Sequence, residues 1–223
     1  GIRSDATGLV TLKNLTVDGR DQGILPDALY ADKNAYFFSG VAAQNSDVTL
    51  DGIRVTGIRG VEPGLPPDVQ LLYPDEPWGM NTNFGIFAES ALGSPMRTLT
   101  VQNSIVTKFQ KTALIAWGPT LVVDIHDNVL QGYGQTLHSS GNGIQIGATD
   151  RSSSGGGDRR GTSGKIYNNQ ILGFGHVVPV PGQPGSYLNL GQGGPTGVIL
   201  TYAASNFEIY NNTITGPGFN NWY

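Results

Sequence analysis

A small group of residues has the types and spacing that acid–base chemistry on a bound ligand would need. Glu89 and Trp117 occupy the same position in consecutive copies of a short repeated phrase. Their main chains are therefore expected to lie one strand spacing, about 4.8 Å, apart. Gln145 lies in the next copy, one position away from the slot that Glu89 and Trp117 share. Lys111 lies in the short connection just before the copy that contains Trp117, and His138 lies in the later connection just before the copy that contains Gln145.

Two reactions suit these residue types. An elimination needs a base near the proton that is removed, and Lys111 or His138 could be that base while Arg151 neutralises a negative charge. Hydrolysis of a glycosidic bond needs two carboxyl groups on opposite sides of the bond, for which Glu89 with Asp75 or Asp150 is the available pairing. Each residue also has a structural explanation, since an outward Glu, Lys or Trp on a strand often only covers the surface.

The elements that must position these residues are set by a ten-residue phrase that occurs six times. Its copies are VTLKNLTVDG from Val10, VTLDGIRVTG from Val48, LTVQNSIVTK from Leu99, VDIHDNVLQG from Val123, GKIYNNQILG from Gly164 and FEIYNNTITG from Phe207. Alternating apolar residues predict two short strands in each copy, with a bend between them. The bend carries Asn, Asp or Gly, which tolerate left-handed backbone angles, and we expect these side chains to hydrogen-bond from copy to copy. His126 precedes the bend in the slot of Tyr167 and Tyr210, which predicts a structural ladder of rings on another face.

A second phrase supplies a further strand in each repeat. It reads GVAAQ at Gly40, GIFAE at Gly85, ALIAW at Ala113, GIQIG at Gly143 and GVILT at Gly197. Three strands per repeat predict an all-β fold, a right-handed parallel β-helix (solenoid) of about five to six turns in one domain spanning residues 1–223. Calling the GVAAQ-type strand the first, its inward column would end with Val198 and Leu200, and its outward column would be Gln44, Glu89, Trp117, Gly147 and Thr201.

Irregular connections separate the copies, and a solenoid's loops gather on particular faces. Those that lead from a third strand to the next first strand span about 19–39, 58–84, 108–112, 133–142 and 174–196, and they carry many aromatic residues. We expect these long loops to wall a groove along the outward face of the first strands. Aromatic rings in such a groove, Trp117 and Trp78 among them, suit stacking against sugars, with Gln145 and His176 as polar partners.

The Asn bends, the phrases NGIQIG and YNNTITG, and the long loops beside the first strands resemble the pectin-lyase-like superfamily, including its carbohydrate-binding and sugar-hydrolase type repeats. The similarity covers about residues 9–216. It implies an extracellular protein that binds a polysaccharide or oligosaccharide on the first-strand face and, where catalytic, acts as a polysaccharide lyase or glycoside hydrolase. The hydrolase motifs of the superfamily are altered here, at Asn81-Thr82-Asn83 and Gly175-His176-Val177. The alternative is a non-catalytic adhesin or spike-like module.

Composition limits the partners. The net charge is −4, with no concentrated basic surface, which argues against nucleic acid. No apolar run is long enough for a membrane span, and the absence of Cys favours a secreted or cell-surface bacterial protein. No cofactor is indicated and no metal ligand set is recognised, although loop aspartates such as Asp18, Asp21, Asp27 and Asp32 leave calcium open. The uncapped ends of the solenoid leave three alternatives: a truncated piece of a longer chain, caps formed by loops, or a homo-oligomer.

Overall fold

The computed structural model describes residues 2–4, 8–21, 23–24, 38–58, 60–61, 83–109, 111–136, 141–147, 159–176, 178–179, 187–188 and 199–215. These residues form three six-stranded sheets in which every neighbouring pair of strands is parallel. The first sheet contains β1 (Ile2–Ser4), β5 (Phe38–Gln44), β9 (Asn83–Glu89), β12 (Thr112–Trp117), β15 (Asn142–Ile146) and β20 (Ile199–Thr201).

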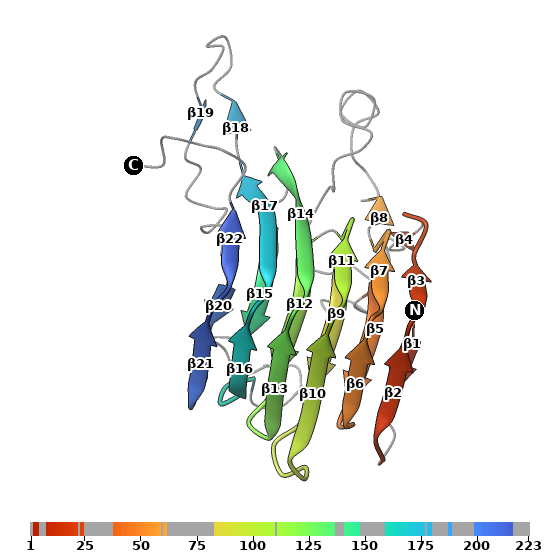
Figure 1. Cartoon of the computed structure of the whole chain (residues 1–223), viewed down its shortest axis with the longest axis vertical. Coiled ribbons are helices and arrows are strands. Elements are labelled where there is room, and N and C mark those ends of the chain that lie inside the picture. The colour runs from red at the N-terminus through yellow and green to blue at the C-terminus, as the bar shows by residue number, and fades with distance from the viewer. Residues whose placement is uncertain are drawn as a thin grey trace.

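The other two sheets are built from the strands on either side of the repeated bend. The second sheet contains β2 (Val10–Lys13), β6 (Val48–Asp51), β10 (Arg97–Gln102), β13 (Leu121–His126), β16 (Ser163–Tyr167) and β21 (Phe207–Tyr210). The third contains β3 (Thr16–Asp18), β7 (Arg54–Thr56), β11 (Ile105–Thr107), β14 (Val129–Thr136), β17 (Gln170–His176) and β22 (Thr213–Thr215). The chain visits the three sheets in turn, and successive turns follow one another from the red N-terminal strands to the blue C-terminal ones (Figure 1). This is the arrangement of a parallel β-helix, as the repeat predicts.

Two small pairings accompany the solenoid. Strand β4 (Gly23–Ile24) pairs in parallel with β8 (Gly60–Val61), and β18 (Val178–Pro179) pairs antiparallel with β19 (Tyr187–Leu188). Among the described residues there is no helix, so none could cross a membrane.

The repeated phrase sets the register of the second sheet. The first residues of its six copies, from Val10 to Phe207, lie side by side on neighbouring strands. Alternate residues such as Leu50, Val101 and Ile125 therefore point into one continuous core, where they are fully buried. Stacking like on like buries an apolar column without any turn needing a core of its own.

The bend has the backbone conformation that its residue types predict. Asn14, Asn103, Asp127, Asn168 and Asn211 all have φ between 51° and 56°, and Gly52 has φ 64°. Asn, Asp and Gly are the residues that enter this left-handed region at least cost. Each bend turns the chain from the second sheet to the third at the same place in every turn.

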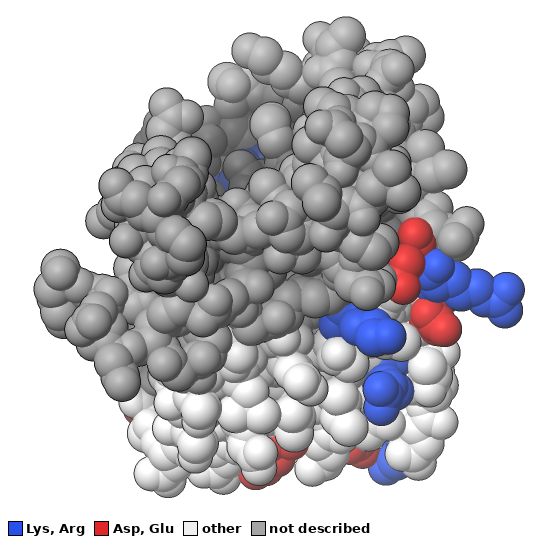
Figure 2. All heavy atoms as spheres, turned by 90° about the horizontal axis from the view of Figure 1, so that it is seen from above, with Lys and Arg blue, Asp and Glu red and all other residues white. Residues whose placement is uncertain are grey.

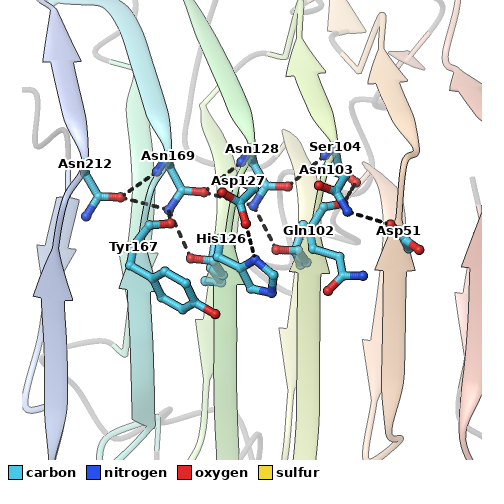
Figure 3. A network of polar contacts seen from close by, with 12 residues as sticks. Asp51, Gln102, Asn103, Ser104, His126, Asp127, Asn128, Tyr167, Asn169 and Asn212 are labelled. Carbon is cyan, nitrogen blue, oxygen red and sulfur yellow. Dashed lines mark hydrogen bonds and ion pairs between the residues drawn. The ribbon is translucent and has the colours of Figure 1, made fainter.

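The hydrogen-bonded ladder lies one residue after the bend, which corrects the expectation that the bend residues themselves form it. Asn128, Asn169 and Asn212 follow the left-handed residue, and the amide of each donates to the side-chain oxygen of the next or to main-chain carbonyls (Figure 3). Each Oδ1 also accepts the main-chain N–H of the preceding turn, from Ser104 to Asn128, from Asn128 to Asn169 and from Asn169 to Asn212. The left-handed residue itself is exposed, because its side chain points away from the core.

The outward face of the second sheet carries the expected stack of rings. The rings of His126 and Tyr167 lie 4.8 Å apart, and those of Tyr167 and Tyr210 lie 5.0 Å apart, with interplanar angles of 10° and 6°. His126 Nδ1 is 2.7 Å from Asp127 Oδ2. His126 is thus placed in a ladder on a different sheet from Glu89, as its position in the phrase predicts.

Two details differ from the sequence interpretation. In the last turn Ile144 pairs with Ile199 and Gln145 with Leu200, so Ile199 occupies the inward position predicted for Val198, which lies outside the described residues, and Leu200 and Thr201 each move by one position. Strands β14 and β17 also continue to Thr136 and His176, inside the predicted loops, because they pair again after an irregularity between Gln131 and Gly134. The predicted site residue His176 is therefore the last residue of a strand in the third sheet.

Candidate functional site on the first sheet

Three rows of side chains cross the outward face of the first sheet. The N-terminal row contains Ser39, Phe84, Thr112 and Asn142 in register; the middle row contains Ala42, Phe87, Ile115, Gln145 and Leu200; the C-terminal row contains Gln44, Glu89 and Trp117. Phe84, Phe87, Ile115 and Trp117 form a cluster separate from the main core, which places these rows on the other side of the sheet. Each row therefore mixes polar and apolar residues: Phe84 and Trp117 lie among polar residues in the two end rows, and Gln145 is the polar residue of the middle row.

Trp117 is packed into this face rather than presented on it. Its indole meets the rings of Phe87 and Phe84 edge to face, at 5.3 Å and 6.3 Å, and only 5 % of the residue is exposed. The guanidinium of Arg159 lies 4.2 Å from the centroid of the indole ring. A cation over an aromatic face is attracted to it electrostatically. A sugar could stack on that side of Trp117 only by displacing Arg159, so the predicted stacking role has no open surface in this arrangement.

Arg159 is brought to this end of the sheet by the polypeptide that follows it. Thr162 Oγ1 donates to the carbonyl of Gly118, directly after Trp117, and the N–H of Gly161 donates to the carbonyl of Ala203. These bonds tie the segment that enters β16 to the turns on either side of it. The sequence analysis does not predict Arg159 at this site; the sequence signal for it is its place at the end of the one long connection between a first and a second strand.

Glu89 is a half-buried carboxyl group beside this cation. It lies directly opposite Trp117 on one neighbouring strand and Gln44 on the other. Burial raises the pKa of Glu89, while the positive charge of Arg159 and a hydrogen bond with Gln44 act in the opposite direction. A carboxyl group with a raised pKa beside a guanidinium can accept hydrogen bonds from the hydroxyl groups of a ligand or hold a proton for transfer.

Lys111 lies at the opposite end of the face. It immediately precedes Thr112, whereas Glu89 is level with Trp117, the last residue of the same strand. At about 3.3 Å per residue, Thr112 and Trp117 are about 16 Å apart along the strand. Burial lowers the pKa of Lys111. The structure therefore does not bring Lys111 and Glu89 together at one reacting bond.

The remaining predicted residues divide into placed and undescribed ones. Gln145 faces outward in the middle row, where its Oε1 accepts from Asn142 Nδ2 at 3.3 Å. His138, Arg151 and Trp78 lie outside the described residues, as do Asp75 and Asp150, the proposed partners of Glu89. Within the described ranges, Glu89 is the only carboxylate in the three rows.

A metal site is not assembled by the part of the chain that the structure describes, where no three His, Asp or Glu side chains gather closely enough to hold an ion. Asp27 and Asp32, two of the four aspartates considered for calcium, lie outside that part. Seen from above, the described surface is largely uncharged, and its Lys, Arg, Asp and Glu side chains gather at one edge and along the lower rim (Figure 2). The expectation that nucleic acid is not a partner stays a prediction.

Comparisons of the chain with family models, with curated protein sequences and with solved structures found no match.

Proposed function

We propose that this chain is an extracellular, carbohydrate-binding right-handed β-helix of the pectin-lyase-like kind, which binds a glycan on the outward face of the first sheet. The observation that carries the proposal is the Glu89–Arg159 pair beside the aromatic cluster of Phe84, Phe87 and Trp117. Carboxylate and guanidinium groups are hydrogen-bonding partners for sugar hydroxyls, and the aromatic cluster, which is itself buried, supports the two charged side chains from below. The resemblance of the repeat to carbohydrate-active β-helices supports the same face.

Binding is better supported than hydrolysis. A glycosidase needs two carboxyl groups within about 5–10 Å of each other, whereas the described residues bring one, Glu89, to this face. An elimination would need a base near Glu89 and Arg159, and Lys111 lies at the far end of β12. Cleavage by either route therefore depends on residues such as Asp75, Asp150, His138 or Arg151.

The test is a screen of the folded chain against neutral and uronate polysaccharides, with binding followed by affinity gel electrophoresis. Reducing ends and the absorbance of unsaturated products, measured in the same samples, report hydrolysis and elimination. Glu89→Ala should weaken binding about tenfold or more, because hydrogen bonds to charged groups contribute about 1.5–3 kcal/mol. Glu208→Ala is the matched control, since Glu208 is an exposed carboxylate on the second sheet that pairs with Lys165 at 3.1 Å.

Equal affinity of the Glu89→Ala and Glu208→Ala variants for every bound glycan would refute the assignment of the site. An absence of binding across the whole panel would refute the function itself.

A second candidate is a spike-like module that assembles through the end of the solenoid. Ile209 and Ile214 occupy inward positions of the last described turn, yet they are 47 % and 51 % exposed. Apolar side chains in such positions suit burial against another turn or another subunit. Light scattering tests this candidate: an oligomer that Ile209→Asp dissociates would support it, and a monomer at high concentration would exclude it.

A further inference from the structure

The last described turn of the solenoid has an open edge. Strands β20, β21 and β22 are the terminal strands of the three sheets, so each pairs on one side only among the described residues (Figure 1). An edge strand presents a row of unpaired main-chain N–H and C=O groups, to which a strand of another polypeptide can add.

The main chain beside the bend shows what this edge lacks. In each earlier turn the carbonyl of the residue after the bend accepts an N–H from the next turn, and the five pairs are Leu15 with Arg54, Ile53 with Ile105, Ser104 with Val129, Asn128 with Gln170 and Asn169 with Thr213. Asn128 and Asn169 also donate their own N–H to the side-chain oxygen of the following asparagine. Asn212 is the outermost member of this ladder, and neither its carbonyl nor its N–H has a partner among the described residues (Figure 3).

Apolar and aromatic side chains of the same turn are also open. Ile209 and Ile214 continue the inward columns of Ile166 and Ile171, yet they are 47 % and 51 % exposed, whereas Ile166 and Ile171 are fully buried. Tyr210, the last ring of the stack on the second sheet, is 41 % exposed. Ile166 and Ile171 are buried because a further copy of the phrase pairs beside them, so one more copy would bury Ile209 and Ile214 in the same way.

These open groups specify the partner. It is an extended segment parallel to β21 and β22, because every neighbouring pair in the three sheets is parallel. Aliphatic residues at its third and eighth positions would cover Ile209 and Ile214, an aromatic ring at its fourth would stack on Tyr210, and an asparagine at its sixth would accept the N–H of Asn212.

The first turn of a second folded copy does not meet this description. Its residue after the bend is Leu15, which has no side-chain acceptor for the N–H of Asn212, and its Val17 is already buried. The partner is therefore a segment that is not yet part of a folded solenoid.

We propose that β21 and β22 form a docking site for an extended segment of another polypeptide that carries the repeated phrase and adds to the solenoid as a further parallel turn. Its main chain pairs with the open edge, and its side chains continue the apolar columns, the ring stack and the asparagine ladder. The inference goes beyond the glycan function and involves neither Glu89 nor Arg159.

The experiment titrates the folded chain into fluorescein-labelled peptides and measures fluorescence anisotropy. The probe is the phrase FEIYNNTITG, and the controls are the same residues in scrambled order and the probe with the change Asn212→Ala. We expect the probe to bind about tenfold or more tightly than the scrambled peptide. Asn212→Ala in the peptide should weaken binding about fivefold, because the N–H of Asn212 in the chain would lose its acceptor.

Variants of the chain place the binding on this edge. Ile209→Asp should weaken binding of the probe about tenfold or more, since it sets a charge against an aliphatic side chain. Ile105→Asp is the matched control, because Ile105 is 38 % exposed but lies on the outward face of β11, which has neighbours on both sides. Circular dichroism shows whether both variants are folded. In hydrogen exchange, the amide proton of Asn212 should gain protection with the probe and gain none with the Asn212→Ala peptide.

Scrambled peptide that binds as tightly as the probe, or probe binding that Ile209→Asp leaves unchanged, would overturn the docking site. An oligomer of the chain that Ile209→Asp dissociates, without any affinity for the probe, would also overturn it and leave the spike-like module standing. Glu89→Ala should bind the probe as tightly as the parent chain, so a failure of the glycan function and a failure of this proposal appear in different measurements.

Discussion

Replacing Asn169 by alanine tests whether the buried asparagine ladder holds the second and third sheets together. Asn169 is 1 % exposed, and its Oδ1 accepts the main-chain N–H of Asn128 while its Nδ2 donates to the carbonyls of Ile125 and Tyr167. Loss of the side chain leaves the N–H of Asn128 buried without an acceptor, at a cost of about 1–3 kcal/mol, and removes the hydrogen bonds that the two amide hydrogens of Asn169 make to Ile125, Tyr167 and Asn212, worth about 1 kcal/mol for each hydrogen. We therefore expect Asn169→Ala to lower the free energy of unfolding by about 3–5 kcal/mol.

The adjacent residue provides the control. Asn168 is exposed and has φ 56°, a conformation that glycine adopts freely, so Asn168→Gly should change the free energy of unfolding by less than about 0.5 kcal/mol. Both changes in the free energy of unfolding are to be measured by urea unfolding followed by far-ultraviolet circular dichroism. Hydrogen exchange supplies a local readout, because the amide proton of Asn128 should lose protection in Asn169→Ala alone. Equal destabilisation by the two variants, or a loss below about 1 kcal/mol for Asn169→Ala, would refute the reasoning.

Three further predictions concern charged groups and glycine. Hydrogen bonds from Asn103 and then Lys13 lower the pKa of Asp51 to about 2. The stabilising contribution of the Asp51 carboxylate is therefore present above pH 3.8 and is lost as the pH falls through about 2. In Asn103→Gly, a carbon NMR titration should show the pKa of Asp51 returning toward 3.8. Burial raises the pKa of Glu89 above 4.5, so the folded state gains stability as the pH falls through the folded pKa toward 4.5. Glu89→Gln should therefore be more stable than the parent at neutral pH, and the difference should vanish below pH 4.5 in unfolding curves; a constant difference would contradict this. Both Gly164 and Gly93 have positive φ, but a Cβ on Gly164 would overlap a main-chain oxygen of the facing strand β13, whereas a Cβ on Gly93 would contact nothing. Gly164→Ala should therefore lower the free energy of unfolding by at least about 2 kcal/mol more than Gly93→Ala does, as measured by thermal unfolding.

The repeated phrase carries enough information to predict the sheets and their register. Val10, Val48 and the later copies align because each copy places its apolar residues at the same spacing from the left-handed bend, and the core accepts only that register. The repeat predicts the hydrogen-bonded ladder at the bend residues, one position before Asn128, Asn169 and Asn212, which form it. Two adjacent asparagines look alike in sequence, and only the geometry of the bend decides which one points inward.

The site was harder to predict for a different physical reason. The repeat places Glu89 and Trp117 side by side correctly, but it says nothing about what covers them. Arg159 reaches Trp117 from a segment that follows a connection without any counterpart in the other turns. The sequence also does not show that the buried hydroxyl of Thr112 lacks a hydrogen-bonding partner among the described residues, because that depends on the three-dimensional surroundings and not on the position of Thr112 in a period-two pattern.

The direction of the asparagine ladder has a consequence for the making of the protein on the ribosome. The N–H of Asn128 donates a hydrogen bond to Asn169, 41 residues later, and the N–H of Asn169 donates one to Asn212, 43 residues later. At a synthesis rate of about 5–20 residues per second, the acceptor for each of these N–H groups is synthesised about 2–9 s after the bend itself. During synthesis, the most recently made bend of the nascent solenoid thus has a main-chain N–H without its acceptor, and this N–H can pair with whichever strand reaches it first. Correct assembly requires that this strand be the next copy of the phrase. The spacing between copies therefore determines how long each bend lacks its acceptor during synthesis, as well as the shape of the solenoid.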